Sequence, residues 1–142
     1  MKIFIDANVL VATLNKEYPV FSHSARVLSL ADSPKFKLYT SSLCLAISFY
    51  FASKKSSNQV ARKKIKLLKE RMNLAVISEQ AVQQALDNPK VLDLEDGFQY
   101  YAAREAKCSC IVTEDRNDFH FAEMEILDCE SFLLKHFFES NH

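Results

Sequence analysis

Apolar runs of strand length alternate with segments of helical periodicity along the whole chain. The run Ile3-Phe4-Ile5 has the length and the β-branched content of a buried strand. Further strands are expected at 36–40, 74–77, 109–113 and 125–127, and helices at 8–14, 21–31, 43–52, 59–71, 79–86, 93–107 and 131–138. Strands that are separated by helices form parallel sheets with right-handed crossovers. The pattern therefore predicts an α/β fold in which helices flank a parallel sheet.

Residues 43–52 are the segment whose pattern is ambiguous. The run L-C-L-A-I-S-F-Y-F-A is almost wholly apolar, so it suits either a buried strand or a buried helix. Ser41 and Ser42 precede it and are favoured N-cap residues, which favours the helix. Its apolar surface is wider than a single buried stripe. We interpret it as core alone, or as core that also contacts another chain, in a homodimer or with a partner protein.

Length and composition indicate one domain, residues 1–142, with a sizeable core, because 49% of the residues are apolar. Lys and Arg total 18, as do Asp and Glu, but 54–71 holds eight basic residues against one acid, and 87–130 holds twelve acids. The basic segment suits contact with an RNA backbone or is simply a solvated helix face. The candidates for RNA contact are Lys54, Lys55, Arg62 and Lys63.

The four cysteines have neither a C-x-x-C pair nor the spacing of a zinc site. Three of them lie in apolar runs, where free cysteine behaves as a small buried hydrophobe. No signal peptide precedes them, and no apolar run approaches the length of about 18 residues that a membrane span needs. We therefore expect reduced thiols in a cytoplasmic protein that does not enter a membrane.

Acidic residues cluster where strands end and helices begin. Asp6 follows the first strand, Asp93-Leu94-Glu95-Asp96 opens a helix, and Glu114-Asp115 with Asp118 follows the fourth strand. Helix capping explains Asp6 or Asp93 alone, and a solvated loop explains the last group. Their joint position instead favours a shared site at one sheet edge. Such carboxylates suit Mg²⁺ or Mn²⁺, and metals of this kind assist phosphodiester hydrolysis.

Five motifs together resemble the PIN-domain family over essentially the whole chain. They are I-D-A-N-V-L, S-S-L-C-L-A, D-L-E-D-G-F-Q-Y-Y-A-A, C-I-V-T-E-D-R-N-D-F and C-E-S-F-L. Within the family the chain is most similar to small toxin nucleases of type II toxin–antitoxin pairs. The resemblance implies a three-layer Rossmann-like fold with a five-stranded sheet of order 3-2-1-4-5. It also implies a Mg²⁺ or Mn²⁺ site, cleavage of RNA, and inhibition by a cognate antitoxin.

Carried over by position, the resemblance implies a set of site residues. The catalytic residues would be Asp6, Asp96 and Asp115, and the metal ligands would be these three with Asp118. Asn8 and Thr113 would support the site by hydrogen bonding, which orients metal ligands. Glu95 and Asp93 rank lower, since Glu95 is expected on a different side of the helix and Asp93 is the better N-cap.

One departure from the family concerns the helix after the second strand. Many members carry a Glu there, whereas the matching residue in this chain is Ile47 or Ser48, and no acid lies between Asp32 and Glu70. A missing ligand should weaken metal binding. Two hypotheses follow, an active ribonuclease and a degenerate PIN domain that binds RNA or protein without cutting. A receiver-like or phosphatase-like domain that uses Asp6 is a weaker third, because no suitable lysine follows the fourth strand.

Overall fold

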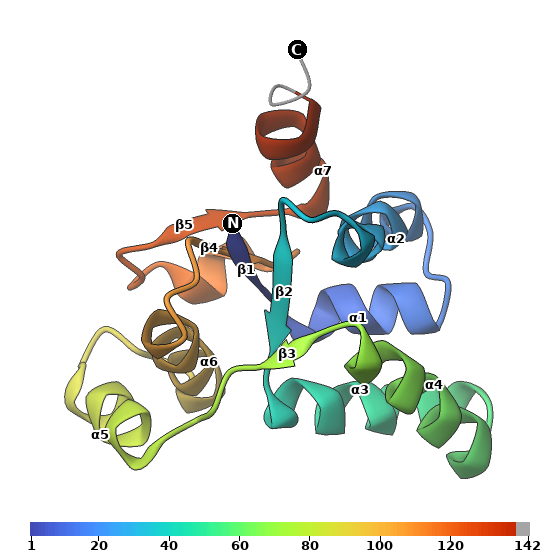
Figure 1. The fold of residues 1–142 in the computed structure, drawn as a ribbon. Coiled ribbons are helices and arrows are strands. Elements are labelled where there is room, and N and C mark those ends of the chain that lie inside the picture. The colour runs from blue at the N-terminus through green and yellow to red at the C-terminus, as the bar shows by residue number, and fades with distance from the viewer. Residues whose placement is uncertain (139–142) are drawn as a thin grey trace.

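The computed structural model describes residues 1–138 and contains a five-stranded parallel sheet of order β3-β2-β1-β4-β5 (Figure 1). The strands are β1 Lys2–Ile5, β2 Lys37–Thr40, β3 Asn73–Leu74, β4 Cys110–Val112 and β5 Glu125–Leu127. Each strand pairs in parallel with its neighbours, and helices connect most of them. The α/β class and the strand order predicted from the sequence are therefore confirmed.

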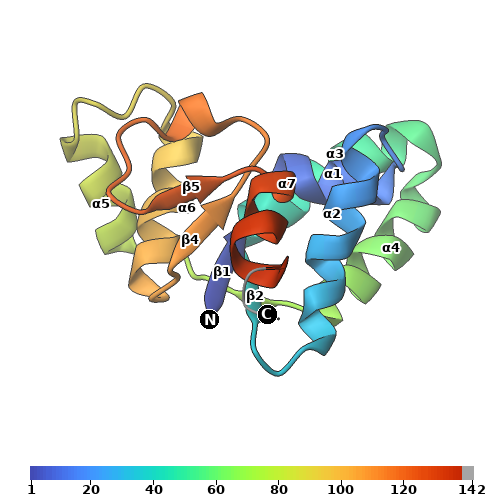
Figure 2. The same ribbon diagram turned by 90° about the horizontal axis from the view of Figure 1, so that it is seen from above.

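Helices lie on both sides of this sheet. They are α1 Ala7–Leu14, α2 Val20–Ser29, α3 Ser42–Lys55, α4 Asn58–Glu70, α5 Glu79–Asp87, α6 Leu94–Glu105 and α7 Cys129–Phe132. Two 3₁₀ turns, Leu30–Asp32 (η1) and Arg116–Phe119 (η2), and a π-helical segment, Leu133–Phe138 (η3), complete the fold. Figures 1 and 2 place α5 and α6 on one side of the sheet, and α1 to α4 on the other.

The central strand β1 is buried because both of its edges are paired and both of its faces are covered. Ile3, Phe4 and Ile5 are fully buried. Phe4 is in register with Tyr39 of β2 on one side and Ile111 of β4 on the other. The next residue, Asp6, continues the pairing, since its N–H donates to the Val112 carbonyl at 3.0 Å. The C-terminal ends of β1 and β4 therefore lie side by side, and the loops that follow the two strands are close together.

Most element boundaries differ slightly from the predictions, and two of the differences have a clear physical cause. The third strand covers Asn73–Leu74 rather than 74–77, and only one more bond, from Ala75 N–H to the Thr40 carbonyl, extends it. It lies at the edge of the sheet, where Val76 is exposed and has no second strand to cover it. The last helix begins at Cys129 rather than 131, because the Asp128 carboxylate accepts the Ser131 N–H and caps it.

The ambiguous segment 43–52 is helical and forms most of α3. Ser41 caps it, since its hydroxyl accepts the Cys44 N–H at 3.1 Å. Cys44 and Ala52 face the core, whereas Tyr50 and Phe51 are exposed. The helix therefore contributes one face to the core and leaves an aromatic face uncovered.

The structure also bears on the expectations about thiols and membranes. The four cysteines are free and buried, namely Cys44, Cys108, Cys110 and Cys129. Within residues 1–138, no helix combines the length and the apolar character needed to cross a membrane.

Candidate functional site

Asp6 is positioned by two elements at once. It is the N-cap of α1, and its Oδ1 accepts the Ala7 N–H at 2.8 Å. Its Oδ2 accepts the Thr113 hydroxyl at 2.9 Å. Only 8% of Asp6 is exposed, so the carboxylate is nearly buried at the end of the central strand. The sequence analysis treated helix capping and a place in a shared acidic site as alternatives for Asp6. The geometry of Asp6 is compatible with both.

The Thr113 hydroxyl joins the loops that follow β1 and β4. It donates to Asp6 and accepts from Asn8 Nδ2 at 3.0 Å and from the Asp115 N–H at 3.1 Å. Asn8 also accepts the Glu114 N–H at 3.1 Å through Oδ1, and its Nδ2 lies 3.3 Å from Asp115 Oδ2. Asp6, Asn8, Thr113 and Asp115, predicted as neighbours, form one hydrogen-bonded network.

The acidic start of α6 supplies a second wall. Asp93 is the N-cap, as predicted, and its carboxylate accepts the Glu95 N–H at 2.8 Å. Asp96 follows in the first turn and is half-buried. Gly97 lets this turn pack closely, because a Cβ there would lie 2.7 Å from the Val91 Cγ1 atom. Glu95 and Asp93, which ranked lower in the sequence analysis, line the same cavity as Asp96.

The carboxylates face a cavity of about 410 Å³, which we call the acidic cavity. Its predicted lining residues are Asp6, Asn8, Asp93, Glu95, Asp96, Asp115 and Asp118. Among residues 1–138, no Lys, Arg or His lines it. Within residues 1–138, no three His, Cys, Asp or Glu side chains lie close enough to form a ready-made metal cage. A hydrated ion that keeps several waters, as Mg²⁺ does, is the kind of cation that suits such a spread of carboxylates.

The surroundings of the acidic cavity disfavour the ionised form of several carboxyl groups that line it. Burial raises the pKa of Asp6, which the hydrogen bonds from Thr113 and the Ala7 N–H partly offset, and the charges of Asp115 and Asp118 raise it further. Burial, followed by the charges of Asp93 and Asp6, raises the pKa of Asp96 to about 7. The pKa of Glu95 is also raised, by burial first. A bound cation would relieve this repulsion.

Ile47 rather than Ser48 occupies the cavity wall where a further acid was expected. Ile47 lines the acidic cavity, whereas Ser48 is fully buried and donates its hydroxyl to the Cys44 carbonyl at 2.7 Å. The wall formed by α3 is therefore apolar at this point. Phe51, one turn further along α3, also lines it and was not singled out from the sequence.

Glu17 is an acidic residue of the cavity that the sequence analysis missed. Helix α1 ends in a Schellman motif, in which Lys16 takes a left-handed conformation with a φ of 51°. The Glu17 N–H then donates to the Ala12 carbonyl at 2.8 Å, and the Lys16 N–H to the Thr13 carbonyl at 3.4 Å. This turn brings Glu17 to the acidic cavity. No glycine marks the turn, so the turn is hard to predict from the residue types alone.

The predicted RNA-contact residues lie outside the acidic cavity. Lys54 and Lys55 are in the last turn of α3, and Arg62 and Lys63 are in the first half of α4. All four are exposed, and none lines the acidic cavity. The structure therefore does not place them against the carboxylates, although α3 carries both Ile47 and the two lysines.

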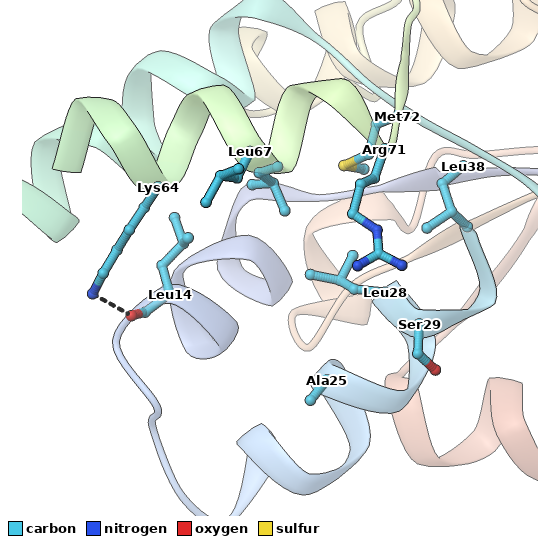
Figure 3. Close-up of a pocket in the computed structure, with 10 residues that line it drawn as sticks. Leu14, Ala25, Leu28, Ser29, Leu38, Lys64, Leu67, Arg71 and Met72 are labelled. Atoms are coloured by element: carbon cyan, nitrogen blue, oxygen red, sulfur yellow. Dashed lines mark hydrogen bonds between the residues drawn. The ribbon is translucent and has the colours of Figure 1, made fainter. Parts of the chain in front are cut away.

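A second hollow, of about 310 Å³, is apolar and lies between α2 and α4 (Figure 3). In the close-up, Leu67 of α4 and Leu28 of α2 approach it from opposite sides. The Lys64 ammonium donates to the Leu14 carbonyl at 3.3 Å, and Arg71 forms an ion pair with Asp32. The lining residues are Leu14, Ala25, Leu28, Ser29, Leu38, Lys64, Leu67, Leu68, Arg71 and Met72. We call it the α2–α4 groove.

Comparisons with known proteins agree with this geometry, in which carboxylates from separate loops surround the end of a central parallel strand. The PIN domain family model matches residues 2–117. The chain belongs to the PIN-domain family. Ribonuclease VapC1 of Aquifex aeolicus (strain VF5), a curated protein, is 28% identical to this PIN domain over 138 residues, which cover 92% of each chain.

Three solved structures share the fold at low sequence identity. VapBC-1 from nontypeable Haemophilus influenzae aligns with a TM-score of 0.68 at 17% identity, over 92% of this chain and 99% of that one. Mycobacterium tuberculosis VapC20, a sarcin-ricin loop cleaving toxin, gives 0.67 at 16% identity, over 86% and 95%. VapBC2 from Rickettsia felis, bound to promoter DNA, gives 0.66 at 16% identity, over 90% and 98%. These likenesses support the PIN fold described above.

Proposed function

We propose that this PIN domain is a divalent-metal-dependent endoribonuclease of the VapC toxin type, which uses Mg²⁺ or Mn²⁺. The observation that carries the proposal is the acidic cavity, where carboxylates from α6 and from the loops after β1 and β4 meet and where none of the lining residues that the structure describes is basic. The pKa of Asp96, raised by burial first and then by the charges of the neighbouring carboxylates, fits a site built for a cation. The similarity to ribonuclease VapC1 supports RNA as the substrate.

Asp6, Asp96 and Asp115 would hold the metal, with Asp118 beside them. The metal, when bound, supplies an activated water and stabilises the leaving oxygen of the phosphodiester. Thr113 orients the Asp6 carboxylate by donating to its Oδ2. Asn8 holds the loop that carries Asp115, through the Glu114 N–H and the Asp115 side chain. Hydrogen bonds of this kind fix metal ligands in position, and their loss typically lowers affinity about 10- to 100-fold.

Glu17 and Ile47 define the remaining wall of the acidic cavity in the proposed enzyme. Ile47 cannot bind a metal, so the site has less negative charge on α3 than the family pattern implies. Glu17 lines the same cavity and adds a carboxylate from the end of α1. We propose that Glu17 offsets part of this loss by attracting the cation, directly or through water.

The second candidate function is a degenerate PIN domain that binds RNA or protein without cleavage. It is favoured by a specific observation, the apolar Ile47 in the cavity wall. RNA cleavage assayed with Mn²⁺, with and without a chelator, separates the two functions. The ribonuclease proposal predicts cleavage by the wild type that the chelator and Asp96→Asn both abolish. Intact RNA in the wild-type reaction, with binding retained, would support the degenerate domain.

We further propose that a cognate antitoxin inhibits the enzyme and docks in the α2–α4 groove. Leu67 in the α2–α4 groove is 64% exposed, and Lys64 and Arg71 also line the groove. This lining suits an amphipathic segment with acidic flanks. Two structural neighbours are VapBC complexes, which supports a partner of this kind. Leu67→Glu should abolish co-purification with the antitoxin while RNA cleavage by the free toxin is unchanged. Four buried free cysteines suit a reducing compartment, so we propose a cytoplasmic location.

A further inference from the structure

Phe51 is an exposed aromatic ring at the edge of a site made of carboxylates. It lines the acidic cavity, yet 47% of it is exposed. The carbonyl of Phe51 accepts Asn15 Nδ2 at 3.4 Å, which ties this turn of α3 to the end of α1. A phenylalanine ring that is half exposed contributes little to the core. At the edge of the acidic cavity, it suits a ligand that has an apolar face and that reaches the carboxylates.

Tyr50 supports the ring of Phe51 from the side. The two ring centroids lie 5.2 Å apart with planes at 83°, so they meet edge to face. This is a favourable geometry for an aromatic pair, and it restricts the ring of Phe51. Tyr50 is itself 52% exposed. The pair therefore forms an apolar platform, Tyr50 and Phe51, which we call the aromatic platform.

Cationic side chains continue from the aromatic platform along the last turn of α3. The Lys54 ammonium lies 4.2 Å from the centroid of the Tyr50 ring. Lys55, the next residue, is exposed. Arg62 of α4 contacts Phe49 instead, which is two residues before Phe51 and therefore lies on another side of α3. The surface thus changes from carboxylates to rings to lysines along α3.

We propose that Phe51 stacks on an unpaired base of single-stranded RNA while Lys54 and Lys55 follow its backbone away from the acidic cavity. The inference rests on the proposed function, because it takes RNA as the substrate. Exposed rings that stack bases, beside cations that contact phosphates, are how proteins hold single strands. In a duplex the bases are already paired and stacked, so the platform selects unpaired RNA. Phe51 is then a substrate-positioning residue.

Fluorescence anisotropy tests the stacking directly. The probe is a labelled single-stranded RNA of about 12 nucleotides, bound to protein that carries Asp96→Asn, so that binding is read without cleavage. Adding Phe51→Ala should weaken binding about tenfold, the loss expected for one stacked base, and Phe51→Tyr should restore it. Leu86→Ala, at an apolar residue on α5 that is 55% exposed, is the matched control and should change nothing. The duplex form of the same RNA should bind equally to all variants.

An abasic scan separates stacking from a general effect on the protein. A single abasic site moved along the RNA should weaken binding at one position, and there Phe51→Ala should cost nothing further. Unchanged single-strand affinity in Phe51→Ala, or an equal loss at every abasic position, overturns the proposal. So does a dimer that becomes monomeric in Phe51→Ala with RNA binding intact, since the ring would then serve a protein interface. Absence of cleavage by the wild type would refute the nuclease and leave this binding result standing.

Discussion

The charge on Asp96 should destabilise the metal-free protein. The folded-state pKa of Asp96 is raised from the usual 3.8 to about 7, by burial first and then by the charges of Asp93 and Asp6. Between these two pH values the folded state binds more protons than the unfolded chain. The free energy of unfolding of the metal-free protein therefore falls as the pH rises from about 4 to about 7. Asp96→Asn should remove most of this pH dependence and raise stability above pH 7.

The size of the effect follows from the pKa shift. A rise from 3.8 to about 7 corresponds to about 4 kcal/mol, at about 1.4 kcal/mol per unit. Asp96 is only half-buried, and screening by solvent reduces this to about 2 kcal/mol. The variant also loses the favourable interaction of a first-turn acid with the α6 dipole, about 0.5 kcal/mol. We expect a net gain of about 1.5 kcal/mol at pH 8, which raises the Tm by about 5 °C.

Thermal unfolding with and without metal measures both halves of the prediction. In EDTA, Asp96→Asn should melt above the wild type. With Mn²⁺ at about 100-fold over its Kd, the wild type should gain about 2.7 kcal/mol and melt above the variant, so the order reverses. Glu79→Gln is the matched control, because Glu79 is an exposed first-turn acid of α5 outside the acidic cavity. If Asp96→Asn melts below the wild type in EDTA at pH 8, the reasoning about repulsion is wrong.

Substitutions at four further positions test other parts of the site. Ile47→Glu should lower the Tm in EDTA and strengthen Mn²⁺ binding, which calorimetry would detect. Glu17→Gln should weaken Mn²⁺ binding severalfold and leave the Tm in EDTA unchanged or higher. Thr113→Val should cost about 1–3 kcal/mol of unfolding free energy in urea, since it leaves buried partners unpaired, whereas Thr113→Ser should keep Mn²⁺ affinity. Gly97→Ala should lower the free energy of unfolding, measured in urea, by about 1–2 kcal/mol, because the added methyl group overpacks against Val91.

Much of the fold follows from local sequence patterns. The buried run of β1 and the caps at Ser41 and Asp93 are short-range signals, and the structure bears them out. The third strand was placed too far along, because Ala75 and Ile77 alternate with exposed residues without continuing the sheet. An edge strand ends where the chain leaves its single neighbour, which depends on tertiary contacts rather than on periodicity.

The residues of the acidic cavity were predictable at the ends of β1 and β4 and at the start of α6. Asp6 and Asp115 follow β1 and β4 directly, so the parallel sheet brings them together. Glu17 reaches the acidic cavity through a left-handed turn at Lys16, a backbone state that a non-glycine residue does not announce. Phe51 belongs to an apolar run that suggests burial in the core, whereas its actual exposure depends on how α3 packs. Buried Gln99, whose partner is the Ser41 hydroxyl, likewise has no sequence signal.

Calorimetric titration of the metal-free protein with Mn²⁺ tests the central claim most directly. The acidic cavity should bind Mn²⁺ in the wild type, and Asp6→Asn should weaken that binding at least tenfold. The variant keeps a favoured N-cap residue for α1, so a retained Tm in EDTA would show that the fold is intact. No Mn²⁺ binding by the wild type, or equal binding by Asp6→Asn, would contradict the account.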